Sequence, residues 1–159
     1  MNEKIVRLAK EHLPAVAELE RQCFAEPWSV HALELFLGED AVAFAALSEK
    51  GEPVGYGGML LVPDEGQVLN LAVHPKARRQ GIGSRILAAL LEEAKKCGSK
   101  SVSLEVRVSN RTAIGLYEHF GFRSVGIRRH FYRHPAEDAL VMVCDLSALP
   151  SDMFEIFQE

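Results

Sequence analysis

The chain has 159 residues, of which 48% are hydrophobic and 25% charged, and its formal net charge is −4. This length and composition are typical of one globular domain with its own core. The negative charge argues against broad nucleic-acid binding, which needs a phosphate-neutralising surface, and no apolar run is long enough to span a membrane. We therefore expect one domain over residues 1–147, a tail over residues 148–159, and neither a nucleic-acid nor a membrane partner.

The three cysteines, Cys23, Cys97 and Cys144, are odd in number and widely spaced. Such a set does not form the framework of a disulfide-rich secreted domain. The amino terminus also has no apolar core of the kind found in signal peptides. Together these features predict a cytoplasmic protein.

The first half of the chain alternates extended and helical patterns. Ser29 is suited to cap a short helix, and polar turns are expected at residues 49–51 and 64–66. The expected elements are a strand at 4–8, a helix at 12–23, a short helix at 29–37, strands at 41–47 and 53–62, and a strand ending at Val73.

The second half alternates strands and helices more clearly. Its expected elements are a helix that opens after Gly81 and stops at Gly98, a strand at 101–107, a helix at 110–120, and strands at 122–128 and 138–146. One face of the first of these helices carries Ile82, Ile86, Leu87, Leu90, Leu91 and Ala94. This order favours an α/β fold in which antiparallel hairpins flank a parallel strand pair and helices cover both faces.

A turn rich in arginine and glycine, Arg78-Arg79-Gln80-Gly81-Ile82-Gly83, precedes that helix. Gly81 and Gly83 lack the β-carbons that would keep a ligand away from the backbone. The first helical turn offers unpaired N–H groups and a partial positive charge to phosphate oxygens, and Arg78 and Arg79 add cationic donors. The spacing fits neither a nucleotide P-loop nor a dinucleotide-binding fingerprint. A solvated basic turn is the alternative interpretation.

Glu105 lies on the polar face of the strand at 101–107, opposite Val102, Leu104 and Val106. A carboxylate in such a place is usually just exposed to solvent. This strand, however, is expected to be interior to the sheet and to end beside the phosphate-binding turn, where ligands of open α/β sheets gather. There Glu105 can accept a proton from an ammonium group, and an α-amino group, with a reference pKa of about 8, suits this task better than lysine.

Tyr117 and Asn110 belong to the following helix. Tyr117 either packs in the core with a satisfied hydroxyl or donates a proton to a departing thiolate. Asn110 caps the helix, binds the arm of a carrier, or does both. A cationic side chain, an unobstructed backbone turn, a carboxylate and a phenol therefore follow one another along the chain in the order needed for acyl transfer from a phosphate-bearing carrier.

Two other kinds of chemistry have less support in the sequence. His130 and His134 have a spacing compatible with metal ligation, but neither a cysteine pair nor an acidic partner accompanies them, and we expect no metal. A covalent route through cysteine is not expected, because none of the three cysteines belongs to the constellation around Glu105.

The turn at residues 78–83 resembles the acetyl-CoA pyrophosphate loop of the GNAT N-acetyltransferase superfamily. The segment from Leu104 to Phe122 resembles, more narrowly, the protein N-terminal acetyltransferases and, within them, the RimI-like ribosomal-protein alanine N-acetyltransferases. Pro27-Trp28-Ser29 and the segments at 128–132 and 137–139 match the same group. The resemblance therefore extends to about residue 146.

This resemblance implies a mixed, mostly antiparallel central sheet with a splayed parallel strand pair and helices on both faces. Glu105 would be the general base and Tyr117 the general acid, and Trp28 and Tyr132 would line the channel for a protein terminus. One departure is Phe131, which stands where the family often has the first of two tyrosines and which concerns peptide selectivity. Acetyl-CoA, the co-substrate, would be bound by Leu71, Ala72, Val73, Arg78, Arg79, Gln80, Gly81, Ile82, Gly83, Ser84 and Asn110.

The function implied by the resemblance is acetyl transfer from acetyl-CoA to the N-terminal alanine of a small-subunit ribosomal protein, by direct attack in a ternary complex. A GNAT enzyme for another amine (a different protein terminus, a lysine side chain or a small metabolite) is one alternative. A catalytically idle CoA-binding module is another, and the presence of both Glu105 and Tyr117 argues against it.

Overall fold

The computed structural model describes residues 3–149, which form one seven-stranded sheet in the order β1-β2-β3-β4-β5-β7-β6. The strands are β1 (Lys4–Arg7), β2 (Ala41–Leu47), β3 (Pro53–Val62), β4 (Glu65–Val73), β5 (Ser101–Arg107), β6 (Phe122–Arg133) and β7 (Ala136–Asp145). Neighbouring strands are antiparallel except β4 and β5, which are parallel. The predicted mixed, mostly antiparallel sheet with one parallel pair is confirmed.

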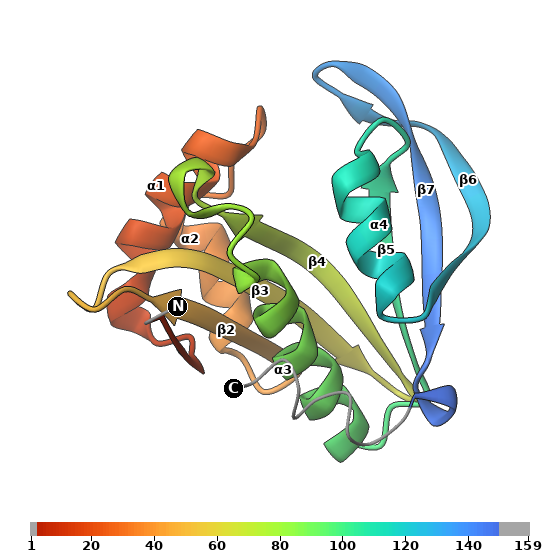
Figure 1. The fold of residues 1–159 in the computed structure, drawn as a ribbon, viewed down its shortest axis with the longest axis horizontal. Coiled ribbons are helices and arrows are strands. Elements are labelled where there is room, and N and C mark those ends of the chain that lie inside the picture. Colours follow the sequence, from red (N-terminus) through yellow and green to blue (C-terminus); the bar gives the residue numbers. More distant parts are fainter. Residues whose placement is uncertain (1–2, 150–159) are drawn as a thin grey trace.

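Helices cover both faces of this sheet, as predicted. The α-helices of the described residues are α1 (Leu13–Cys23), α2 (Val30–Leu33), α3 (Ile82–Lys96) and α4 (Arg111–His119). The short 3-10 helices are η1 (Lys10–His12), η2 (Glu34–Leu37), η3 (Pro75–Ala77) and η4 (Leu146–Ala148). α3 and α4 pack on one face, whereas α1 and α2 pack on the other (Figure 1). Within residues 3–149, no helix is long and apolar enough to cross a membrane.

The amphipathic pattern of α3 decides how this helix packs. Its six predicted core side chains are each at most 1% exposed and face β2, β3 and β4. The helix approaches the sheet closely because Gly57 has no side chain: a β-carbon there would lie 2.8 Å from Cγ2 of Ile86. Gly98 follows the helix with a φ of 87°, a left-handed conformation that glycine adopts at little cost, and is the predicted stop.

β4 and β5 pair over three residues and then separate. Residues 65–67 of β4 lie opposite residues 101–103 of β5, and Ser103 Oγ donates a hydrogen bond of 2.6 Å to Oε1 of Glu65. Beyond this point the molecule divides into two arms (Figure 1). We call β1–β4 with α1, α2 and α3 the first arm, and β5–β7 with α4 the second arm. The predicted parallel pair is therefore splayed.

The β6–β7 hairpin is longer than predicted. β6 continues to Arg133 rather than stopping at residue 128, and β7 begins at Ala136 rather than at 138. The register shifts between Arg128 and Tyr132, so the intervening residues bulge, and His130 takes a φ of 55° while its N–H bonds to Asp138 Oδ1 at 2.9 Å. This bulge breaks the alternation that a sequence pattern needs, which is why the predicted strand stopped there.

Smaller boundary errors have local causes. Residues 64–66 were expected to form a turn, but Asp64 alone takes the left-handed conformation (φ 65°), and Glu65 already pairs with Val62 and with Ser101. The helix expected to run to residue 37 is α-helical only to Leu33 and continues as the 3-10 helix η2. Residues 150–159 of the predicted tail lie outside the described residues.

Candidate active site

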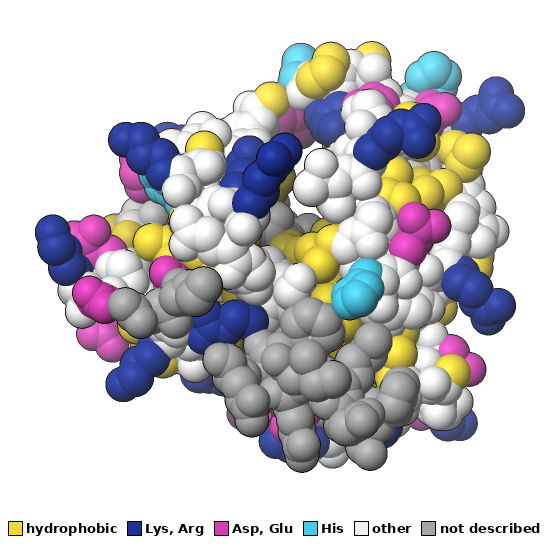
Figure 2. Space-filling view, viewed as in Figure 1, with side chains coloured by type: hydrophobic (Ala, Val, Ile, Leu, Met, Phe, Trp, Pro, Cys, Tyr) yellow, Lys and Arg dark blue, Asp and Glu magenta, His cyan; other side chains and the backbone are white. Residues whose placement is uncertain are grey.

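A cleft of about 690 Å³ opens where the two arms diverge. Residues 68–71 of β4 form one wall and residues 104–107 of β5 form the other. The segment between α1 and α2 and the turn of the β6–β7 hairpin border the mouth. Figure 2 shows the molecule hollowed between the two arms. The separation of two parallel strands thus produces this cavity, at a place where α/β sheets commonly bind ligands.

Glu105 lines this cleft from β5. Its side chain is 27% exposed, and its Oε2 lies 3.3 Å from Nε of Arg128 on β6. The carboxylate is therefore neither buried in the core nor turned to bulk solvent. It faces a cavity with one cation beside it, a position compatible with accepting a proton from a bound ammonium group.

Tyr117 lines the same cleft from α4, and its ring packs against Phe122 with 5.6 Å between the ring centroids. Its side chain is 7% exposed, so the predicted core packing is correct, but it also borders the cavity. Burial raises the pKa of the Tyr117 hydroxyl well above the ordinary value for tyrosine, and nearby Tyr132 raises it further. The hydroxyl therefore stays protonated at neutral pH and can act as a donor.

The arginine-glycine turn leads directly into α3. Gly81 is the N-cap of the helix with a φ of 79°, and Arg79 also takes a left-handed conformation, with a φ of 66°. A β-carbon at Gly81 would meet no atom within 4 Å, and one at Gly83 would have its nearest neighbour at 3.6 Å. The turn is therefore open in front of the N–H groups of α3, and it fits a diphosphate.

The two arginines of this turn are placed differently. Arg78 donates from Nε to the carbonyl oxygen of Val73 at 3.0 Å, and its Nη2 lies 3.5 Å from the sulfur of Cys23. Its guanidinium thus fastens the end of β4 to the end of α1. Arg79 is left as the better candidate for a phosphate contact.

The edge of β4 that faces the cleft has no strand beside it after the splay. Residues 71–73 pair with β3 on their other side, and pairing with β5 ends at Gln67. The register between β3 and β4 shifts at Gly58, so Leu69 is an extra residue in β4. Such a bulged, half-paired strand offers backbone N–H and C=O groups to an extended ligand. This is the place where the sequence predicted binding by Leu71, Ala72 and Val73.

The predicted peptide-side residues also border the cleft. Trp28 stacks on Phe36 with ring centroids 5.3 Å apart, and Tyr132 lies under the guanidinium of Arg107 at 4.3 Å. Phe131, 45% exposed, lines the mouth and packs edge-on against Tyr132. Trp28 of the first arm and the Phe131–Tyr132 pair of the second arm therefore face the same entrance.

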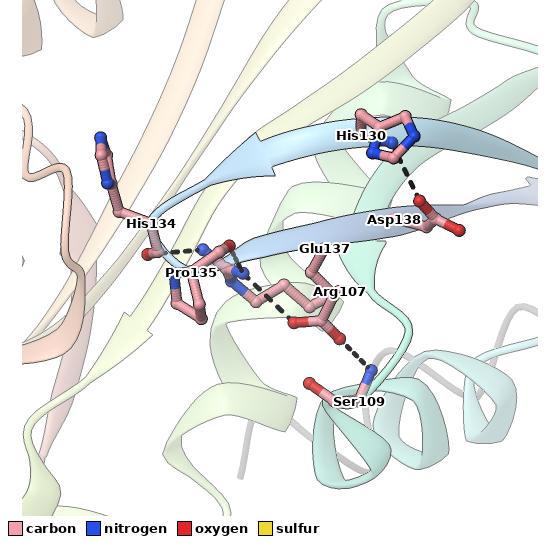
Figure 3. Close-up of polar contacts among 7 residues, drawn as sticks. All are labelled: Arg107, Ser109, His130, His134, Pro135, Glu137 and Asp138. Carbon is pink, nitrogen blue, oxygen red and sulfur yellow. Dashed lines mark hydrogen bonds and ion pairs between the residues drawn. The ribbon is translucent and has the colours of Figure 1, made fainter.

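Arg107 holds the turn of the β6–β7 hairpin over this entrance (Figure 3). Its guanidinium donates to the carbonyl oxygens of His134 at 3.0 Å and Pro135 at 2.9 Å, and it pairs with Glu137 at 3.2 Å. The other carboxylate oxygen of Glu137 accepts a 2.7 Å hydrogen bond from the N–H of Ser109. The sequence did not reveal this role, because the partners of Arg107, two carbonyl oxygens and one carboxylate, lie about thirty residues away along the chain.

Asn110 fulfils the capping role that the sequence predicted. Its Oδ1 accepts a 3.2 Å hydrogen bond from the N–H of Ala113, and the residue also lines the cleft. Within residues 3–149, no three His, Cys, Asp or Glu side chains gather as metal ligands would. His130 and His134 lie well apart on the hairpin in Figure 3.

One expectation about cysteine was wrong. Cys23 does border the cleft, whereas no cysteine was expected near the constellation around Glu105. Its sulfur lies 3.6 Å from the carbonyl oxygen of Val73, and burial raises the pKa of the Cys23 thiol. Because the thiolate is the nucleophilic form, the structure gives no support to a covalent route through Cys23. All three cysteines are free.

The cleft, the open turn before α3 and the half-paired strand define an acyltransferase fold, and the model of the acetyltransferase (GNAT) family matches residues 13–122. The chain belongs to this family. Among its relatives is a putative [ribosomal protein bS18]-alanine N-acetyltransferase of Bacillus subtilis, 38% identical over 83% of this chain and 88% of the relative. The [ribosomal protein bS18]-alanine N-acetyltransferase of Escherichia coli K12 is 37% identical over 90% of this chain and 97% of its own length.

Solved structures agree with this assignment. The crystal structure of the ribosomal-protein-S18-alanine N-acetyltransferase from Escherichia coli superposes with a TM-score of 0.84 at 34% identity, covering 94% of this chain and 97% of that one. The predicted family, fold class and enzyme class are therefore confirmed.

Proposed function

We propose that the protein transfers the acetyl group of acetyl-CoA to the α-amino group of an N-terminal alanine, and that its substrate is ribosomal protein bS18. The relatives named above carry this activity in their names. The observation that carries the proposal is that Glu105 and Tyr117, from different elements, face one cleft that Trp28 and Tyr132 also line.

The cofactor side of the site is assigned from the backbone. The turn at residues 79–84 holds the diphosphate through the N–H groups of the first turn of α3 and through Arg79. The free edge of β4 at residues 71–73 binds the pantetheine arm in the manner of an added strand, and Asn110 contributes a side-chain amide. Acetyl-CoA supplies an activated acetyl thioester at the splay.

The chemistry follows from two groups with opposite tasks. Glu105 takes a proton from the ammonium of the acceptor, which leaves a neutral amine that can attack the thioester directly. Tyr117, kept protonated by its raised pKa, gives a proton to the sulfur as it leaves. We assign the stabilisation of negative charge on the carbonyl oxygen to backbone N–H groups of β4 around residues 71–73.

An α-amino group suits this site better than a lysine side chain. Its reference pKa is about 8, against about 10.4 for lysine, so a carboxylate removes its proton at lower cost. A ribosomal-protein substrate also agrees with the predicted cytoplasmic location. The predicted lack of nucleic-acid and membrane partners stays a prediction.

The first experiment is a substrate panel. An alanine-initiated peptide copied from the start of bS18 is assayed beside the same peptide with a blocked terminus, a lysine-containing blocked peptide, free amino acids and polyamines. We expect turnover only with the free alanine terminus. Faster turnover of lysine or a small amine would assign a different acceptor. Acetyl-CoA binding without turnover on any amine would assign a non-catalytic module.

The second experiment tests the base. Glu105→Gln should lower kcat by about a hundredfold or more, the usual contribution of general base catalysis, and leave the affinity for acetyl-CoA within about twofold. Glu118→Gln makes the same chemical change at an exposed position on α4 and should leave kcat unchanged. Comparable activity of Glu105→Gln across neutral pH would remove the base assignment.

A further inference from the structure

Glu20, in the last part of α1, is a fully buried carboxylate at the border of the cleft. Its relative exposure is 0%, and it lies among the residues that line the cavity. Glutamate is almost never fully buried unless its charge is compensated. Its spacing of four residues from Val16 places it on the buried face of α1.

The two oxygens of Glu20 have different partners. Oε1 accepts a 2.9 Å hydrogen bond from the backbone N–H of Trp28, in the segment between α1 and α2. Oε2 accepts hydrogen bonds from the hydroxyl of Tyr56 on β3 and, at 2.9 Å, from Nδ2 of Asn70 on β4. Asn70 also donates to the hydroxyl oxygen of Tyr56 at 2.7 Å. One carboxylate therefore joins four elements.

The hydrogen-bond partners of Glu20 lie at two places that shape the cleft, namely the splayed part of β4 and the peptide entrance. Asn70 follows the extra residue Leu69, on the stretch of β4 that has left β5. Trp28 borders the entrance, and its ring is stacked on Phe36, which in turn meets the ring of Tyr56 edge-on. The backbone of Trp28 is thus held by Glu20, and its ring is linked through Phe36 to Tyr56, which also bonds to Glu20.

Burying a carboxylate is costly, and the donors that reach Glu20 here are neutral. An apolar side chain would fill the same space in the first arm without that cost. A carboxylate, unlike leucine, can accept hydrogen bonds from two parts of the structure and so fix the distance between them. The carboxyl group at this position is therefore better explained by the parts of the structure that it joins than by the stability of the core.

We propose that Glu20 is a positioning residue for the acceptor substrate. Its carboxylate fixes the segment between α1 and α2, with Trp28, relative to the splayed part of β4, and so sets the width of the peptide entrance. This inference rests on the proposed function in one respect, namely that the acceptor enters past Trp28. The turn at residues 78–83 supplies none of the hydrogen bonds to Glu20.

Trp28 is the single tryptophan of the chain, so its fluorescence reports on this segment alone. Glu20→Leu keeps most of the volume and removes both acceptors. We expect the emission of Trp28 to move to longer wavelength and acrylamide to quench it more strongly. We also expect KM for the peptide to rise about tenfold, with KM for acetyl-CoA within about twofold of the wild-type value.

The control is Val16→Ala, one helical turn earlier on α1. Val16 is also fully buried, so the substitution lowers stability without removing a hydrogen bond to Trp28. Its emission and peptide KM should match those of the wild type well below the unfolding temperature. An equal rise of peptide KM in Val16→Ala would overturn the proposal, because a general loss of packing would then explain both variants.

Milder variants keep the test decisive if Glu20→Leu does not fold. Glu20→Gln retains one acceptor oxygen and should fall between the wild type and Glu20→Leu in both readouts. Tyr56→Phe removes one donor to Oε2 and leaves the bond to Trp28, so it should leave the emission unchanged. Wild-type emission and peptide KM in a folded Glu20→Gln would overturn the proposal. The fluorescence needs no turnover, so a shift of emission in a protein that acetylates no peptide would show that Glu20 holds the Trp28 segment while the proposed function, and with it the role toward an acceptor peptide, is overturned.

Discussion

The two arms of the molecule are built differently. In the first arm, β2 and the middle of β3 are buried at almost every position, because α3 covers one face and α1 with α2 covers the other. In the second arm, β6 is exposed along nearly its whole length, and α4 packs beside it. The first arm carries the proposed cofactor edge and the second carries the hairpin at the peptide entrance. The strands beside the proposed cofactor edge are therefore closely packed on both faces, whereas the hairpin turn at the peptide entrance is held by polar contacts of Arg107.

The two arms also differ in the kind of interaction that an important residue makes. Gly58 in β3 is required by packing, since a β-carbon there would lie 2.3 Å from Cε1 of Phe36. Arg107 in β5 is required by charge and hydrogen bonds, since it holds the hairpin turn through carbonyl oxygens and Glu137. A closely packed position such as Gly58 should therefore govern stability, and a polar contact such as that of Arg107 should govern kinetics. The predictions below test this division.

The largest expected effect is that of Gly58→Ala. The new methyl group would overlap a ring that is itself confined by Trp28 and Tyr56, and overpacking of this kind costs about 3 kcal/mol of unfolding free energy. Urea unfolding measures it. Gly115→Ala in α4 is the matched change in the second arm, where a β-carbon meets nothing within 4 Å. At this position alanine should raise the unfolding free energy by about 1 kcal/mol through its higher helix propensity. Equal effects at the two glycines would contradict the division between the arms.

Tyr117→Phe should act on rate rather than on stability. The ring stays packed against Phe122 while the hydroxyl at the cleft is lost. We expect kcat to fall about thirtyfold, equivalent to about 2 kcal/mol, with the unfolding free energy changed by less than about 0.5 kcal/mol. Because the pKa of Tyr117 is raised, its ionisation should not limit the wild-type rate up to mildly alkaline pH. An unchanged kcat would show that the thiolate leaves without this donor.

Arg107→Ala should loosen the hairpin turn and the orientation of Tyr132. We expect KM for the peptide to rise about tenfold, equivalent to about 1.4 kcal/mol, and the affinity for acetyl-CoA to stay the same. Steady-state kinetics with each substrate varied in turn gives both values. Arg123→Ala removes an arginine from the far end of β6 and serves as the control. A loss of acetyl-CoA affinity in Arg107→Ala would show that the two sides of the cleft are not independent.

The smallest expected effect is a dependence of the unfolding free energy on pH that arises from Glu137. Hydrogen bonding from Ser109, and then the guanidinium of Arg107, lowers the pKa of Glu137 below the ordinary value for a glutamate side chain. The folded state therefore favours the ionised form, and the resulting stabilisation is complete above about pH 4.5 and is lost as the pH falls through the lower folded pKa. Glu137→Gln should be less stable than the wild type at pH 7, and the difference should shrink below pH 4. A difference that does not depend on pH would exclude this origin.

Much of the fold was predictable because its signals are local. The periodicity of α3, its stop at Gly98 and the alternation of β5 each arise within one segment, and the structure has all three. The hairpin was predicted too short, because the bulge before Tyr132 depends on pairing with β7 rather than on local pattern. Glu65 was assigned to a turn because its place in β4 depends on Ser101, far along the chain.

The candidate site shows the same limit. Glu105, Tyr117 and the open turn could be recognised from residue type and order. The roles of Glu20, Arg107 and Arg128 could not, because each depends on a partner that only the tertiary structure brings near. One signal for Glu20 was available, since a charged residue on the apolar face of a helix requires buried partners.

The brevity of the ladder between β4 and β5 has a mechanical consequence. Three residue pairs act as a fulcrum, and β4 extends six residues past it, from Gln67 to Val73. At about 3.3 Å per residue this lever is about 20 Å long, so a twist of about 5° at the fulcrum would displace its tip by nearly 2 Å. Errors of one ångström in the placement of reacting groups can cost two orders of magnitude in rate. The contact between Ser103 and Glu65 lies at this fulcrum, among the last paired residues before the two walls of the cleft separate.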